Sequence, residues 1–167
     1  MAVVLLDNDG ALCVPIFQRP ADMRRHASQM ALPGGRVHEG ESVADCAMRE
    51  LHEELGLEVG ASDELGRLDD FDTRSGFTIT PIVYWSDARA ADLRPSAAEV
   101  AVMFLPTISD LLEAASIAGH GAEFSMLLPG VEVFAPTAAM LYQFAEVALR
   151  GRDVRVADFY QPPWTHR

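Results

Sequence analysis

The sequence lacks the features that mark membrane and secreted proteins. No stretch approaches the roughly 20 consecutive apolar residues that span a membrane, and the short apolar start has no basic flank of the kind that a signal peptide carries. Only two cysteines are present, Cys13 and Cys46, and their positions fit no metal-binding or redox motif. We therefore expect a cytoplasmic protein with no membrane partner and with both thiols reduced.

Positive charge is scarce as well. The chain has 13 Lys and Arg residues against 25 Asp and Glu residues, which gives a formal net charge of −12 at pH 7. Binding to a nucleic-acid backbone needs clustered Lys and Arg, so we expect no nucleic-acid partner. A small anionic substrate stays compatible with this charge, because a divalent cation can neutralise part of a local site.

The 167 residues are enough for one domain with its own core. Because no repeat or change of composition marks a linker, we predict a single domain over residues 1–167, in which 160–167 form an extended tail. The hydrophobic pattern predicts helices at 42–55, 108–115 and 137–149 and strands at 2–6, 11–18, 30–32, 64–71, 78–86, 100–105 and 153–159, the last at a sheet edge. The expected fold class is α/β, with a mixed β-sheet sandwiched between α-helices.

Local signals predict where some of these elements begin and end. Residues 7–10 have the sequence Asp-Asn-Asp-Gly, which suits a hairpin turn between the first two strands. Ser42 and Asp45 have the spacing of a capping box at the start of the first helix. Gly56 is placed to end that helix in a left-handed conformation.

The first helix carries an unusual group of acidic residues. Spacings of three and four place Glu53 and Glu54 beside Glu50 on one helix face. Like charges at these spacings destabilise an isolated helix by about 0.2–0.5 kcal/mol per pair. Carboxylates gathered this closely suit Mg²⁺ or Mn²⁺, whereas the alternative is an ordinary solvated acidic face.

The residues around this helix form a longer pattern. Gly35 is followed after five residues by Glu41, and after seven more by the sequence Arg-Glu-Leu-His-Glu-Glu-Leu-Gly-Leu at 49–57. This resembles the complete signature of the Nudix hydrolases. The resemblance implies the Nudix fold and an enzyme that hydrolyses phosphoanhydride bonds with bound Mg²⁺ or Mn²⁺, which lower the pKa of the attacking water and neutralise phosphate oxygens.

The resemblance also implies a role for each matched residue. Glu53 and Glu54 are expected to be the principal metal ligands, with Glu50 as a further ligand or water-positioning group. The carbonyl near Gly35 is expected to complete the metal shell. The remaining expected roles are a loop shaped by Gly34 and Gly35, an arginine that orients the carboxylates (Arg49), and a glutamate that faces it (Glu41).

Glu99 lies far from this segment in the sequence, just before the predicted strand at 100–105. Nudix hydrolases often place a glutamate from a later loop at the metal site, so Glu99 is a candidate additional ligand or base. The alternative is a surface glutamate in a loop.

Substrate recognition is expected outside the signature, on the loops. The chain resembles an extra motif of the coenzyme A pyrophosphatase subfamily at Arg19, Arg24, His26, Gln29 and residues 33–35. The stretches at 66–69, 73–81 and 136–141 also look like that subfamily. Three positions depart from this motif: Pro20, Leu32 and Ser28, the last of which replaces a glycine. The residues expected to bind substrate are Arg19, Arg24, Gly34, Gly35, Ser75 and Phe77.

Two further groups allow two readings each. Phe71, Phe77 and Trp85 could stack on an adenine, but aromatic residues on predicted strands more often belong to the core. The acidic residues at 69, 70 and 72 could form a second cation site, although a solvated turn is the simpler interpretation.

Three functions therefore stay open. The first is hydrolysis of coenzyme A or acyl-CoA to 3′,5′-ADP and 4′-phosphopantetheine, or its acyl form. The second keeps the chemistry but acts on ADP-ribose, a dinucleotide or a nucleoside triphosphate. The third is a Nudix-fold binding module without catalysis. The resemblance also allows a homodimer, which is common in this family.

Overall fold

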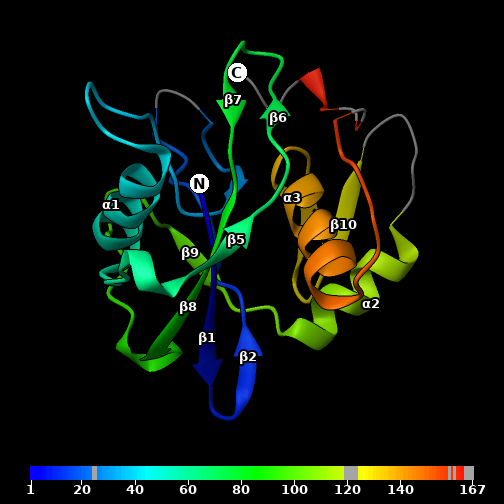
Figure 1. The fold of residues 1–167 in the computed structure, drawn as a ribbon, viewed down its shortest axis with the longest axis horizontal. Helices are drawn as coiled ribbons and strands as arrows, with labels where there is room; N and C mark the ends of the chain where they lie inside the picture. The colour runs from blue at the N-terminus through cyan, green and yellow to red at the C-terminus, as the bar shows by residue number, and fades with distance from the viewer. Residues whose placement is uncertain (24–25, 119–123, 158, 160, 164–167) are drawn as a thin grey trace.

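The computed structural model of the chain describes residues 1–23, 26–118, 124–157, 159 and 161–163. Figure 1 shows a central sheet with helices on both sides. The strands are β1 (Ala2–Asn8), β2 (Ala11–Cys13), β3 (Ile16–Gln18), β4 (Met30–Ala31), β5 (Glu64–Arg67), β6 (Phe71–Asp72), β7 (Thr78–Ile79), β8 (Ile82–Arg89), β9 (Val102–Phe104), β10 (Ser125–Leu128) and β11 (Val131–Phe134). The helices are α1 (Val43–Leu55), α2 (Ile108–Ile117) and α3 (Thr137–Gln143), with short 3₁₀ turns η1 (Ala61–Asp63) and η2 (Ala90–Asp92) and a π-helical continuation of α3, η3 (Phe144–Leu149).

The central sheet has the strand order β2-β1-β8-β5. β1 and β8 run parallel to each other. β2 pairs antiparallel with β1, and β5 pairs antiparallel with β8. A second sheet has the order β4-β3-β9, and β6-β7 and β10-β11 form separate hairpins. The predicted α/β class with a mixed sheet is therefore confirmed.

The alternation of side chains along β1 explains why helices cover both faces of the sheet. Val3 and Leu5 belong to a hydrophobic cluster that includes residues of α2 and α3. Ala2, Val4 and Leu6 belong to the cluster on the other face, which includes residues of α1. Successive side chains of a strand point to opposite faces, so a fully apolar strand needs cover on both sides.

Helix α1 begins and ends where the sequence predicts. The Ser42 hydroxyl accepts the Asp45 amide at 3.1 Å, and the Asp45 carboxylate accepts the Ser42 amide at 3.3 Å. Gly56 has a left-handed conformation with φ of 65°, and its amide donates to the His52 carbonyl at 2.9 Å. Because Leu51 and Leu55 are buried, the helix is held in one rotational setting, and this setting places its glutamates.

Three predicted strands are divided in the structure. The predicted strand at 11–18 divides into β2 and β3, because Pro15 has no amide proton for a sheet ladder. β2 pairs with β1, whereas β3 pairs with β4 and β9 in the second sheet. The predicted strand at 78–86 likewise divides at Pro81, into β7 and β8, and the predicted strand at 64–71 divides into β5 and β6.

The predicted edge strand at 153–159 is wrong for the described residues of that stretch, none of which pairs with a strand. Instead, the Val154 carbonyl accepts the Gln143 side-chain amide at 3.0 Å, and Val156 is fully buried. Its apolar residues therefore pack against the core rather than join a sheet. The β10-β11 hairpin was not predicted, although Pro129-Gly130 between alternating hydrophobic residues is a turn signal.

Three remaining expectations concern the tail, the membrane and the cysteines. The predicted tail at 160–167 lies mostly outside the described residues. Among its described members, Gln161 is buried. No helix in the described part of the chain has the length and apolar character needed to cross a membrane. Cys13 and Cys46 are both buried and unbonded to each other, and burial raises the pKa of the Cys13 thiol to about 11.

Candidate active site

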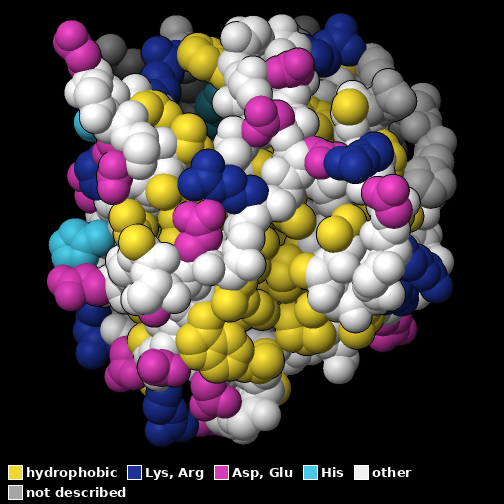
Figure 2. Space-filling model, in the orientation of Figure 1, with side chains coloured by type: hydrophobic (Ala, Val, Ile, Leu, Met, Phe, Trp, Pro, Cys, Tyr) yellow, Lys and Arg dark blue, Asp and Glu magenta, His cyan; other side chains and the backbone are white. Residues whose placement is uncertain are grey.

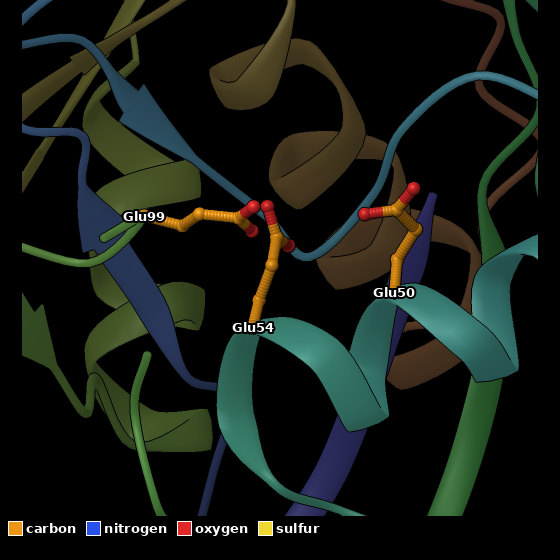
Figure 3. Close-up of side chains that lie close together, drawn as sticks. All are labelled: Glu50, Glu54 and Glu99. Carbon is orange, nitrogen blue, oxygen red and sulfur yellow. The ribbon is translucent and has the colours of Figure 1, made fainter. Parts of the chain in front are cut away.

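Three glutamates from two separate segments meet beside the central sheet. Glu50 and Glu54 come from α1, and Glu99 comes from the loop before β9. One carboxylate oxygen from each lies within 4.8 Å of the others, and Figure 3 shows all three side chains directed at one space. We call this group the carboxylate cluster. Its all-oxygen donor set fits Mg²⁺ or Mn²⁺.

Glu54 is the most buried member of the carboxylate cluster, with 1% of its side chain exposed. It accepts a hydrogen bond from Arg19 Nη2 at 3.2 Å and one from the Gly34 amide at 2.9 Å. Burial nevertheless raises the pKa of its carboxyl to about 7, because these two donors offset only part of the lost solvation. A divalent cation would supply the positive charge that this buried group needs.

Arg49 holds the Glu50 carboxylate in place through a hydrogen bond. Its guanidinium forms a two-pronged contact with Glu41, at 2.8 Å and 3.2 Å, and donates to Glu50 at 2.7 Å. The Arg49 hydrogen bonds lower the pKa of Glu41 to about 2. The predicted contact between Glu41 and Arg49 is thus present, and the planar guanidinium matches this paired geometry.

Glu53 takes a different position from the one expected of a principal ligand. Its side chain is 51% exposed and accepts from Arg49 Nη1 at 2.9 Å. The described side chains therefore bring Glu99 to Glu50 and Glu54, whereas Glu53 lies beside this group. The assignment of Glu53 as a ligand stays a prediction.

The glycine loop approaches the carboxylate cluster more closely than another residue would allow. A Cβ atom on Gly35 would lie 2.0 Å from Glu50 Oε1, which is far inside contact distance. At Gly34 a Cβ atom would lie 2.9 Å from the Met1 backbone. Both glycines are thus needed for close packing, and the Gly34 amide also reaches Glu54.

A pocket of about 340 Å³ lies next to the carboxylate cluster. Arg19 connects the two, because it lines the pocket and donates to Glu54. The pocket volume falls in the range of small-molecule sites. Of the residues expected to bind substrate, Arg19, Ser75 and Phe77 line the pocket, Gly34 and Gly35 contact the carboxylate cluster, and Arg24 lies outside the described residues.

One wall of the pocket is the β6-β7 hairpin. Ile79 of β7 and three residues of the loop between the strands, Thr73, Ser75 and Phe77, line the pocket. The Phe77 ring also stacks under Arg36, with 4.4 Å between the guanidinium carbon and the ring centroid. This contact joins the pocket wall to the loop that begins at Gly35.

Other parts of the pocket come from segments that the sequence did not indicate. The β10-β11 hairpin contributes Val131, Glu132 and Phe134, and Gln161 reaches in from the end of the chain. Gln161 Oε1 accepts the Arg74 amide at 2.9 Å, which ties the tip of the β6-β7 hairpin to that end. Nothing local in the sequence distinguishes these residues, because they meet only in the folded chain.

Ser28 has a left-handed backbone conformation with φ of 59° and lines the pocket. Its carbonyl accepts the Gln18 side-chain amide at 3.0 Å, and the neighbouring Gln29 carbonyl accepts the Arg19 amide at 2.9 Å. Serine here adopts the conformation that glycine reaches without strain. The serine that replaces the motif's glycine therefore still adopts the left-handed backbone conformation.

The structure also locates the aromatic and acidic residues for which the sequence allows two interpretations. Phe71 is buried in the core, as expected, whereas Trp85 on β8 is 39% exposed and bonds to Asp87 at 2.9 Å. Figure 2 shows further exposed hydrophobic side chains in the lower part of the view. The acidic residues at 69, 70 and 72 do not gather, because separate partners hold them: Arg155, Thr80 and Thr78.

These features define an α/β protein with a carboxylate site suited to a divalent cation, beside a pocket large enough for a small molecule. The chain belongs to the NUDIX domain family, whose family model matches residues 1–150.

Known proteins of similar sequence and structure agree with this assignment. The chain is 32% identical to Nudix hydrolase 3 of Caenorhabditis elegans over 118 residues, covering 69% of this chain and 49% of the relative. It is 36% identical to the uncharacterized Nudix hydrolase NudL of Cronobacter sakazakii over 90 residues, covering 47% of each. The chain thus spans about half the length of these curated relatives.

Solved structures show the same fold at low sequence identity. The Nudix hydrolase RenU of M. smegmatis superimposes with a TM-score of 0.56 at 18% identity, covering 92% of this chain and 86% of that one.

Proposed function

We propose that this protein hydrolyses a phosphoanhydride bond with the help of Mg²⁺ or Mn²⁺. The observation that carries the proposal is the carboxylate cluster, in which Glu50, Glu54 and Glu99 bring oxygens within 4.8 Å of one another. When bound there, a divalent cation lowers the pKa of water and neutralises phosphate oxygens. The chemistry therefore needs no nucleophilic side chain.

The residues of the chain have separate tasks in this proposal. Glu50, Glu54 and Glu99 hold the cation, and Glu53 adds an oxygen from the exposed side of α1. Arg49 keeps Glu50 in place through its bond of 2.7 Å. Arg19 lies between the carboxylate cluster and the pocket, where its free donors suit a phosphate oxygen of the substrate.

We further propose that the substrate is coenzyme A or an acyl-CoA, cut to 3′,5′-ADP and (acyl-)4′-phosphopantetheine. Support comes from the motif residues Arg19 and Gln29, both of which line the pocket. It also comes from Ser28, whose left-handed backbone keeps the loop shape that the motif's glycine would give.

A parallel assay tests both levels of this proposal. The protein is incubated with Mg²⁺ or Mn²⁺ and with CoA, ADP-ribose, NADH or dGTP, and products are identified by mass spectrometry. We expect CoA to be cleaved most efficiently. Preference for ADP-ribose or dGTP would overturn the substrate and keep the chemistry, whereas equal inactivity of wild type and Glu54→Gln on all four would overturn the chemistry.

The matched control for Glu54→Gln is Glu58→Gln. Glu58 lies just beyond the same helix, and its side chain is 87% exposed. The same change of charge at this position should leave turnover within about twofold of wild type, because exposed charges are screened by solvent.

A further inference from the structure

The two ends of the pocket differ in chemical character. Arg19 marks the end next to the carboxylate cluster, since it donates to Glu54. Much of the described lining is hydrophobic, and it comes from the two hairpins, from β4 and from the segment after β11: Met30, Phe77, Ile79, Val131, Phe134 and Pro136. Such a lining favours a ligand part that is uncharged and apolar.

Glu132 places a carboxylate in this otherwise uncharged part of the described lining. It lies on β11, opposite Leu127 of β10, and accepts the Ser125 hydroxyl at 2.8 Å. β10 and β11 pack in the same hydrophobic cluster as α2 and α3, whereas α1 packs in the cluster on the other face of the sheet. Figure 1 shows β10 on the far side of the sheet from α1. Glu132 therefore lies away from the carboxylate cluster.

These charges distinguish the two arms of the proposed substrate. The nucleoside arm of coenzyme A carries a 3′-phosphate, which a carboxylate in the lining would repel. The other arm is an uncharged chain that ends in a thiol or an acyl group. We propose that the pocket holds this uncharged arm and that Glu132 selects against acyl groups that end in a carboxylate. The inference rests on the proposed coenzyme A activity.

The test compares two thioesters that differ in terminal charge. We expect wild type to have a higher kcat/KM for acetyl-CoA than for succinyl-CoA. Glu132→Gln keeps the acceptor for Ser125 and removes the charge, so the ratio of kcat/KM for succinyl-CoA to that for acetyl-CoA should rise about fivefold, the effect of one like charge at contact distance in water. Glu132→Lys should raise this ratio further.

Glu113→Gln is the matched control, because Glu113 is an exposed glutamate of α2 outside the pocket lining. It should leave the ratio unchanged. If both thioesters are cleaved but neither Glu132 variant alters the ratio, the inference is overturned and the proposed function stands. If wild type cleaves neither thioester, the proposed acyl-CoA substrate fails and this inference fails with it, whereas the metal-dependent chemistry is judged by the parallel assay with ADP-ribose, NADH and dGTP.

Discussion

The carboxylate cluster and the pocket lie side by side, yet they are built in opposite ways. Two of the three glutamates in the carboxylate cluster, and the loop and arginine that contact them, come from residues 34–54, and their polar contacts are short and wholly or partly buried. The pocket draws on six separate segments, and hydrophobic and uncharged polar groups make up most of its described lining. Most of the carboxylate cluster thus comes from one continuous segment, to which a distant loop adds Glu99, whereas the pocket is formed entirely by the packing of distant segments.

The largest expected loss of kcat comes from a substitution that crowds the carboxylate cluster. Gly35→Ala would place a methyl group 2.0 Å from Glu50 Oε1, so the carboxylate or the loop must move. We expect kcat to fall about a hundredfold, because displacing a catalytic group by about 1 Å has an effect of that order. Steady-state kinetics on the cleaved substrate measure this.

The control is Gly60→Ala, where the added Cβ atom meets its nearest neighbours at 3.7 Å and 3.8 Å, an ordinary contact. Its kcat should stay within about twofold of wild type. Melting temperatures of both variants separate a local displacement from a folding defect. A Gly35→Ala variant that is folded and fully active would contradict the close approach of the loop.

A smaller loss of kcat is expected when Glu50 is held less firmly in place while the positive charge at position 49 is kept. Arg49→Lys preserves the positive charge but cannot bond Glu41 and Glu50 through a planar fork. We expect kcat to fall about tenfold to a hundredfold, as for the loss of groups that orient metal ligands. Arg67→Lys, in an exposed pair with Glu64, is the control and should change kcat by less than about twofold. Equal effects of both variants would show that Arg49 acts by charge alone.

The pocket should respond in KM rather than in kcat. Phe77→Ala removes an aromatic face from the pocket wall and its stacking with Arg36. We expect KM to rise about tenfold, the equivalent of about 1.4 kcal/mol of binding, with a much smaller change in kcat. Leu65→Ala removes a similarly exposed side chain outside the pocket lining and serves as the control. A fall in kcat without a change in KM would show that Phe77 acts in the chemical step, and would contradict the assignment of substrate binding to the pocket.

The smallest effect is expected on stability, at the pocket loop. Ser28→Gly relieves a left-handed conformation that costs a side-chain-bearing residue about 1–2 kcal/mol. Glycine in turn loses about 0.5–1 kcal/mol through the freedom of the unfolded chain. We expect the free energy of unfolding to rise by about 0.5 kcal/mol, as measured by urea denaturation. Ser62→Gly, at an exposed residue without positive φ, should lower it instead.

Much of the carboxylate cluster could be predicted, because its geometry is local. The periodicity of α1, its cap at Ser42 and its end at Gly56 follow from nearby residues, and the structure confirms each of them. A helix with known ends and a buried face fixes the directions of its remaining side chains. Glu50 and Glu54 therefore share a site for reasons visible in residues 42–56.

The contribution of Glu99 and the exposed position of Glu53 were not predictable in this way. Glu99 reaches Glu50 and Glu54 because the loop before β9 is tied to the end of α1. The Ser96 amide donates to the Glu54 carbonyl at 2.9 Å, and the Arg94 amide donates to the Leu55 carbonyl at 2.7 Å. These backbone contacts join segments about 40 residues apart, and backbone groups carry no sequence signal.

The order of residues along the chain accounts for the α/β class, for the ends of α1 and for the acidic face that suits a divalent cation. Packing alone brings Glu99 to that face and joins two hairpins and Gln161 into a pocket. The physical reason is the range of the forces: capping, periodicity and turn preferences act over three or four residues. A pocket exists only after burial of both sheet faces brings distant segments into contact.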